Sequence, residues 1–162
     1  MTRPRTLVAG IGNIFFSDDG FGVEVVRRLA ERSVPEHVRV EDIGIRGVHL
    51  AYELLDGYDI LILVDALPRG EEPGTLTVLE PDRAELTGLP MDAHTMDPGT
   101  VLATLDRLGG TVGRILVVGC EPLEVDEGLG LSQPVAAAID AAADLVLELV
   151  TQAPALAGEK GG

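Results

Sequence analysis

The sequence predicts an α/β protein in which a mostly parallel β-sheet lies between helices as a three-layer α/β/α sandwich. Short apolar segments alternate along the chain with amphipathic segments of helical period, which is the pattern of this class. Residues 58–66 are apolar through their middle, as expected for a central strand covered on both faces. The 162 residues suit one domain, which we place at 1–152, with a disordered tail at 153–162.

The N-terminal half holds two predicted strand–helix pairs. Residues 6–11 form an apolar run that ends near glycine, which is typical of a buried strand. Residues 20–32 place their apolar side chains on one face of a helix. Alternation predicts a second strand at 37–43, and a short helix follows at 48–55.

The C-terminal half repeats this alternation with weaker signals. After a Pro-Gly turn, residues 75–79 show the alternation of an edge strand. Residues 81–98 carry turn residues without a clear period, so we expect mostly loop there. A helix is expected at 100–108, where paired glycines end it, and a fifth strand at 114–119.

The last predicted helix covers residues 135–150 and is too short and too charged for a membrane span. Asp140, Asp144 and Glu148 recur every four positions, which indicates one acidic, solvated stripe. Ser132 stands where a side chain can cap the start of this helix. The chain is therefore expected to be a cytoplasmic protein.

Composition excludes several classes of function. Twelve basic against 27 acidic residues give a net charge of −15, which argues against nucleic-acid and anionic-membrane partners. The single cysteine, Cys120, excludes an internal disulfide. No cationic neighbour adjoins this thiol in sequence to lower its pKa, so we favour a buried structural cysteine over a nucleophile.

Acidic residues follow two predicted strands at their carboxyl ends, where parallel sheets bind ligands. Ser17, Asp18 and Asp19 come soon after the first strand, and Asp65 lies at the end of the third. Helix capping is the structural alternative for the first three, and turn formation for Asp65. Because one cap suffices, the second carboxylate of the pair can face a cation.

His94 precedes the helix at 100–108 and completes a candidate metal site. Two carboxylates, Asp19 and Asp65, with one imidazole make a mixed oxygen and nitrogen ligand set that suits a divalent metal. A hydrogen-bonded surface histidine is the alternative. A dinucleotide fingerprint fails, because Phe15 stands where the third glycine is needed.

These residues resemble the [NiFe]-hydrogenase maturation endopeptidases. The resemblance spans residues 7–150 and rests on motifs in the family's order and spacing. They are Gly10-x-Gly12-Asn13-x4-Asp18-Asp19-Gly20-x-Gly22, Val64-Asp65-Ala66, Pro73-Gly74-Thr75, His94, and Gly128-Leu129-Gly130-Leu131-Ser132-x-Pro134-Val135.

The resemblance implies a phosphorylase/hydrolase-like fold with sheet order 2-1-3-5-4 and an antiparallel fourth strand. It implies a cytoplasmic endopeptidase that removes the C-terminal extension of a [NiFe]-hydrogenase large-subunit precursor after nickel insertion. The family's three metal-binding positions fall on Asp19, Asp65 and His94, which are then both metal ligands and catalytic residues. Nickel is expected to arrive with the substrate, and no organic cofactor is implied.

Two loops are the expected substrate-binding elements. Gly10 and Gly12 let backbone approach the substrate tail. Asn13 either hydrogen-bonds a substrate carbonyl or occupies a left-handed turn position. In the second loop, Gly44-Ile45-Arg46-Gly47 replaces the family's Gly-Thr-x-Gly, and Arg46 either pairs with an acidic substrate group or is a solvated surface residue.

A second function remains open from the sequence. A metal-sensing or precursor-holding protein without peptidase activity would use the same three ligands. For a peptidase, either the metal activates the carbonyl or the attacking water, or Asp19 or Asp65 serves as general base.

Overall fold

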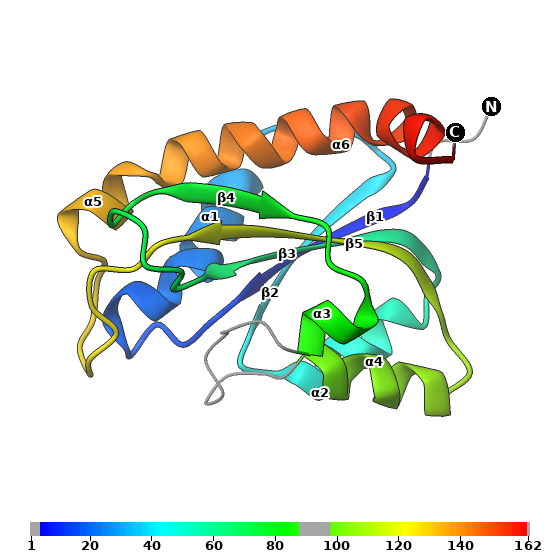
Figure 1. Cartoon of the computed structure of the whole chain (residues 1–162), viewed down its shortest axis with the longest axis horizontal. Coiled ribbons are helices and arrows are strands. Elements are labelled where there is room, and N and C mark those ends of the chain that lie inside the picture. Colours follow the sequence, from blue (N-terminus) through cyan, green and yellow to red (C-terminus); the bar gives the residue numbers. More distant parts are fainter. Residues whose placement is uncertain (1–3, 88–97, 162) are drawn as a thin grey trace.

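The computed structural model describes residues 4–87 and 98–161 and confirms the predicted fold class (Figure 1). Five strands form one sheet in the order β2-β1-β3-β5-β4, and β4 runs antiparallel to β5. The other neighbouring pairs are parallel. The strands are β1 (Thr6–Ile11), β2 (Val38–Gly44), β3 (Tyr58–Ala66), β4 (Leu76–Leu79) and β5 (Val112–Cys120).

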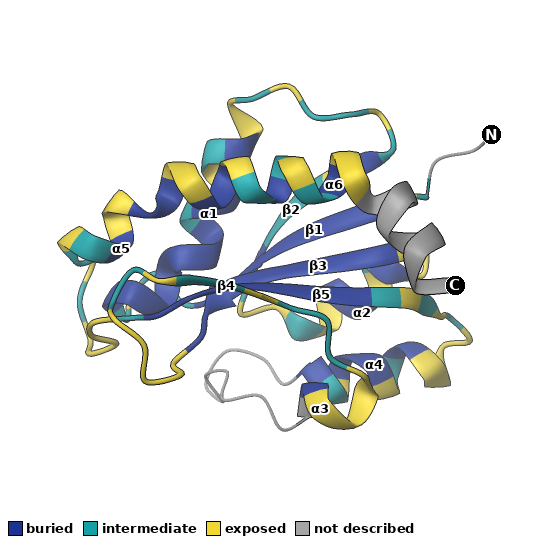
Figure 2. Cartoon of the chain, turned by 45° about the horizontal axis from the view of Figure 1, so that its top comes forward, coloured by how far each residue is buried: buried dark blue, intermediate teal, exposed yellow. Residues whose placement is uncertain are grey.

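Helices cover both faces of this sheet and create two apolar cores (Figures 1 and 2). On one face lie α1 (Phe21–Ala30), α5 (Gln133–Ala137) and α6 (Ile139–Gly161). On the other lie α2 (Gly47–Leu54), α3 (Arg83–Thr87) and α4 (Pro98–Arg107). The central strands β1 and β3 are buried along nearly their whole length because apolar side chains on both of their faces meet helices.

Three local features add to the expectations from the sequence. Within the predicted loop at 81–98, residues 83–87 form the short helix α3, at whose start Asp82 and Glu85 exchange hydrogen bonds, and residues 88–97 lie outside the described residues. The last helix is divided at Ala138 into α5 and α6. The backbone of α6 continues to Gly161, where we expected a disordered tail from residue 153. Within the described ranges, no helix is long and apolar enough to cross a membrane.

The first turn of α1 lies directly on the sheet at Gly22. A Cβ atom added there would stand 1.9 Å from the carbonyl oxygen of Val64 and 2.4 Å from that of Ile11. Gly10 receives the helix in the same way, since its Cβ would stand 2.5 Å from the Gly22 carbonyl oxygen. These two glycines therefore bring the turn before α1 against the carboxyl ends of β1 and β3.

Gly22→Ala is expected to destabilise the protein by about 3 kcal/mol, because the clash is with sheet backbone that cannot move aside. Urea unfolding measures the loss. Gly109→Ala is the control: that glycine has a φ of +87° but no atom within 4 Å of an added Cβ. Gly109→Ala should lower the free energy of unfolding by only about 1–2 kcal/mol, which is the cost of placing an alanine in a left-handed conformation. Equal losses in the two variants would contradict the close packing of α1.

Candidate functional site

Two buried aspartates lie close together at the carboxyl edge of the sheet. Asp19 lies in the 3₁₀ turn η1 (Ser17–Gly20) between β1 and α1, and Asp65 is the penultimate residue of β3. Their exposed fractions are 1% and 0%. Gly12 separates them: a Cβ there would stand 1.9 Å from the carbonyl oxygen of Asp19 and 3.3 Å from Oδ1 of Asp65. Only a glycine fits between the two acidic residues.

Backbone amides orient both carboxylates. The N–H of Asn13 donates to Oδ2 of Asp19 over 2.8 Å, and the N–H of Ala66 donates to Oδ1 of Asp65 over 2.7 Å. A carboxylate offers about four acceptor positions and can both accept hydrogen bonds and ligate a cation. Carboxylate oxygens are among the ligands that divalent metals take in proteins. The pair therefore suits a divalent metal or general-base chemistry.

The third predicted ligand, His94, lies outside the described residues. In the ranges 4–87 and 98–161, no three His, Cys, Asp or Glu side chains group closely enough to hold a metal. The structure thus brings Asp19 and Asp65 together, and His94 stays a prediction.

Asp18 has a role that helix capping does not describe. Its carboxylate accepts hydrogen bonds from the N–H groups of Leu123, Glu124 and Ser132, and from the Ser132 hydroxyl, over 2.7–3.0 Å. Neither η1 nor α1 has a side-chain cap. Ser132 precedes α5 as expected, but its hydroxyl bonds to Asp18 and caps no helix. The fully buried Asp18 side chain therefore pins the β5–α5 loop against the turn that bears Asp19.

The hydrogen bonds decide the ionisation of Asp18. Burial by itself raises the pKa of this carboxyl, but the hydrogen bonds from Glu124, Ser132 and Leu123 together outweigh it. The pKa of Asp18 is therefore lower than that of an ordinary aspartate. The residue is an anion in the folded protein at neutral pH.

Asn13 and Gly10 are held by local contacts. The Oδ1 atom of Asn13 accepts the N–H of Phe15 over 2.9 Å, which closes a turn. The left-handed alternative for Asn13 is wrong, because Ser17, at φ 52°, is the one non-glycine residue with positive φ in the described part of the chain. For Gly10, the contact with Gly22 explains the glycine through packing.

The second predicted loop lines a groove of about 300 Å³ beside Gly12 and Asn13, to which Gly44 and Arg46 contribute. The Arg46 guanidinium folds back and donates to the carbonyl oxygens of Asp42 and Ile43. Gly44 has a φ of +61°, which lets the chain turn there, and Gly47 begins α2. Arg46 thus braces its own loop beside the groove.

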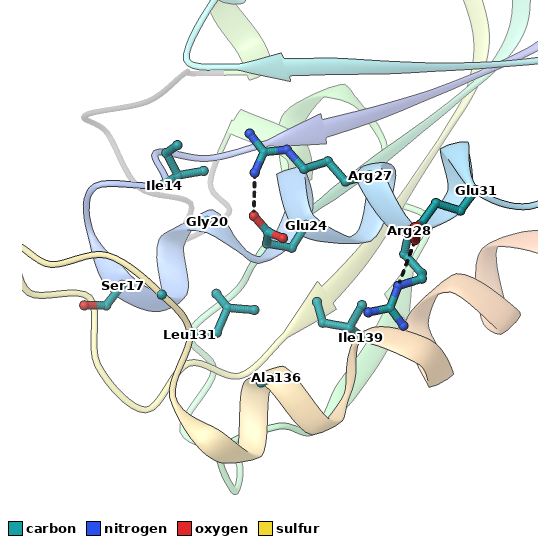
Figure 3. Close-up of a pocket in the computed structure, with 11 residues that line it drawn as sticks. Ile14, Ser17, Gly20, Glu24, Arg27, Arg28, Glu31, Leu131, Ala136 and Ile139 are labelled. Atoms are coloured by element: carbon teal, nitrogen blue, oxygen red, sulfur yellow. Dashed lines mark hydrogen bonds and ion pairs between the residues drawn. The ribbon is translucent and has the colours of Figure 1, made fainter.

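A larger groove of about 570 Å³ lies on the other side of α1 (Figure 3). Ile14, Leu131 and Ile139 give it apolar walls, while Glu24 and Arg27 pair with each other along its rim. The groove separates α1 from the α5–α6 segment next to the turn that bears Asp19.

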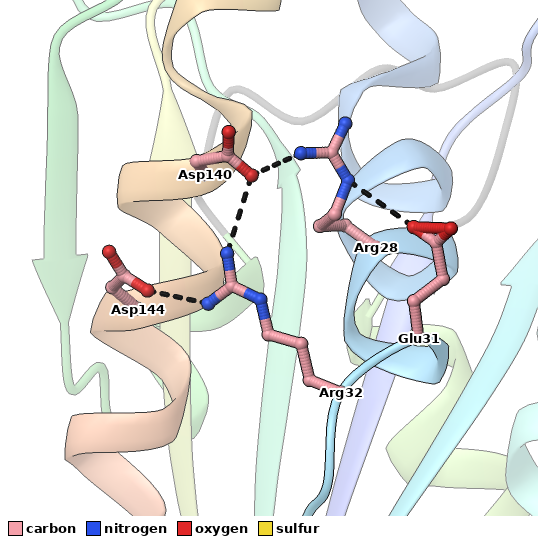
Figure 4. A network of polar contacts seen from close by, with 5 residues as sticks. All are labelled: Arg28, Glu31, Arg32, Asp140 and Asp144. Carbon is pink, nitrogen blue, oxygen red and sulfur yellow. Dashed lines mark hydrogen bonds and ion pairs between the residues drawn. The ribbon is translucent and has the colours of Figure 1, made fainter.

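Ion pairs join α1 to α6 along this groove, whose lining includes Arg28 and Glu31 (Figure 4). Arg28 contacts Glu31 and Asp140, and Arg32 contacts Asp140 and Asp144. Two residues of the predicted solvated stripe are therefore ion-paired, although both stay largely exposed. Exposed pairs of this kind contribute little stability, about 0–1 kcal/mol each.

Cys120→Ser is expected to keep in full the processing activity that the resemblance implies. Burial raises the pKa of the Cys120 thiol to about 12, with further contributions from Asp18 and Glu121, so almost no thiolate exists at neutral pH. The side chain is fully buried in the core between β5 and α5. Turnover of the serine variant, together with absence of labelling by a thiol reagent in the folded wild type, tests this. Lost turnover at unchanged thermal stability would indicate a thiol mechanism.

The fold and the carboxylate pair define an α/β/α protein with its site at the carboxyl edge of a mostly parallel sheet. Residues 23–149 match the family of hydrogenase maturation proteases. The hydrogenase expression/formation protein HupD of Rhizobium leguminosarum bv. viciae is 35% identical over 151 residues, which cover 91% of this chain and 74% of that protein. HupD of Rhodobacter capsulatus is 38% identical over 150 residues, covering 90% and 71%.

Solved structures agree with this assignment. The hydrogenase maturating endopeptidase HybD from E. coli has a TM-score of 0.81 at 30% identity, covering 92% of this chain and 93% of that one. A hydrogenase 2 maturation peptidase from the Thaumarchaeota archaeon SCGC_AB-539-E09 has a TM-score of 0.70 at 35% identity, covering 91% and 98%. The chain belongs to the hydrogenase maturation protease family, and it is an endopeptidase of hydrogenase maturation.

Proposed function

We propose that this endopeptidase makes one cut in the precursor of a [NiFe]-hydrogenase large subunit, removes its C-terminal extension, and acts only after nickel insertion. The family supports the endopeptidase activity. The observation that supports the metal requirement is the pair of buried aspartates beside Gly12 at the carboxyl edge of the sheet. Their carboxylate oxygens are ligands that a substrate carrying its own metal could use.

In this proposal, Asp19 and Asp65, with His94, ligate the nickel that precursor cysteines already hold. Oxygen and imidazole ligands suit this metal. Bound there, nickel would polarise the scissile carbonyl or lower the pKa of a water. The hydrogen bonds from Asn13 and Ala66 fix the orientation of the carboxylates before the substrate arrives. Without nickel, these three ligands gain nothing from the precursor.

The intact mass of a precursor tests this directly. The large-subunit precursor is incubated with catalytic amounts of the protein, once with nickel loaded and once without. Loss of a C-terminal peptide from the nickel-loaded sample alone is the expected result. Equal cutting of both samples would overturn the metal requirement.

A precursor-holding protein predicts a different outcome of the same experiment. The precursor would keep its mass in both samples, and a stoichiometric complex would elute from a sizing column. The family assignment favours the endopeptidase. Absence of both a cut and a complex would contradict this precursor as the substrate.

A further inference from the structure

Exposed large apolar side chains gather on the two loops beside the carboxylate pair. Leu123, Val125 and Leu129 of the β5–α5 loop have exposed fractions of 58%, 46% and 76%, and Phe15 of the β1–η1 loop has 59%. We call these four residues the apolar ridge. Isolated exposed apolar residues are ordinary, but several on adjoining loops mark an interaction surface.

The ridge is rigid because hydrogen bonds join its two loops. The N–H of Ser17 donates to the Gly128 carbonyl over 2.9 Å, and the N–H of Gly128 donates to the Phe15 carbonyl over 2.8 Å. The Asp18 carboxylate adds its contacts to Leu123 and to neighbouring residues of the same loop. Figures 1 and 2 show the two loops next to each other at one end of the sheet. A surface ordered in advance loses little conformational entropy when a partner binds.

Three acidic residues lie among the ridge residues of the β5–α5 loop. Glu124, Asp126 and Glu127 lie within the same loop and are exposed. No lysine, arginine or histidine occurs in the sequence from residue 115 to residue 152. A partner surface that complements this loop is therefore basic as well as apolar. A second copy of the chain would set acidic loop against acidic loop within a dimer of high negative charge, which opposes self-association here.

We propose that the apolar ridge and its acidic residues form a docking surface for the folded hydrogenase large-subunit precursor, separate from the point of cleavage, and that the precursor presents a basic patch there. The inference rests on the proposed function. Continuity with the site supports it, since Asp18 and Asp19 are adjacent and Asp18 anchors the loop that carries most of the ridge. A precursor seated on the ridge is held next to the carboxylate pair.

Two variants test the docking surface with nickel-loaded precursor: Leu123→Ala/Leu129→Ala, and Glu124→Lys/Glu127→Lys. Each is expected to raise KM about tenfold and to leave kcat within about twofold, because the side chains touch the precursor away from the cut. Melting temperatures should stay within about 2 °C of the wild type, since all four side chains are exposed. For the wild type, KM should rise with salt, and the lysine variant should lose this dependence.

Matched controls lie at the other end of the sheet. Leu108→Ala truncates another exposed leucine, which follows α4 and has an exposed fraction of 40%, and Glu36→Lys reverses an exposed charge before β2. Both should keep the wild-type KM. If the ridge variants and the control variants had equal KM values, the ridge would not be a docking surface. The proposed function would still stand in that case, provided that the wild type cleaves the precursor. A wild type that leaves the precursor uncut refutes the proposed function itself, and the docking inference with it. A dimer that the double alanine variant abolishes would identify a second copy as the occupant and overturn the inference.

Discussion

Asp65→Asn is expected to lower kcat/KM for the nickel-loaded precursor by about 10²–10⁴-fold while the protein stays folded. The amide keeps the shape of the side chain and can still accept the Ala66 N–H through Oδ1. It is neutral, however, so it is neither a base nor an anionic ligand. The free energy of unfolding should change by no more than about 1–2 kcal/mol, because the amide keeps the size of the side chain and its bond to Ala66. The rate of peptide release and urea unfolding measure the two effects.

Asp59→Asn is the matched control on the same strand. Asp59 lies near the amino end of β3, where its Oδ2 accepts the Arg5 N–H over 2.8 Å. This variant should process the precursor at nearly the wild-type rate. If Asp65→Asn also retained more than about a tenth of wild-type activity, Asp65 would have no role in the chemistry.

Asp18→Asn is expected to lower the free energy of unfolding by about 2–4 kcal/mol. An amide in this buried position turns an NH₂ group toward backbone N–H donors of the β5–α5 loop, and the variant loses the charge that strengthens the remaining bonds. For a chain of this length the melting temperature should fall by about 5–15 °C. Ser132→Ala, which removes only the hydroxyl contact, should cost about 1 kcal/mol. Similar losses in both variants would contradict the central role of the carboxylate.

The pH dependence of stability provides a second test of Asp18. Because its folded pKa lies below the unfolded value, the ionised group stabilises the fold above about pH 4. That contribution disappears as pH falls through the folded pKa. The stability difference between wild type and Asp18→Asn should therefore be constant at neutral pH and shrink in acid. A difference that grew below pH 4 would show that Asp18 is protonated in the folded protein.

The residues of the proposed site could be chosen from the sequence because their signals are local. Asp65 ends a buried apolar strand, and Asp19 lies in the short acidic segment that follows another. Parallel strands bring their carboxyl ends to one edge, so the two carboxylates were expected to meet. The strand ends and the family resemblance both pointed to Asp19 rather than Asp18, and the structure places Asp19 beside Gly12 and Asp65.

By itself, the sequence determined the order and type of most elements, because apolar periodicity is written residue by residue along the chain. Only the tertiary structure decided the role of Asp18, whose partners Leu123 and Ser132 are 105 or more positions away. The same holds for Gly10 and Gly22, where glycine serves helix-to-sheet packing. An aspartate can cap a helix or bind a distant loop, and a glycine can permit a turn or a close packing contact. The residue type is the same in both cases, so only the fold, which sets the distant backbone groups within reach, decides between the two roles.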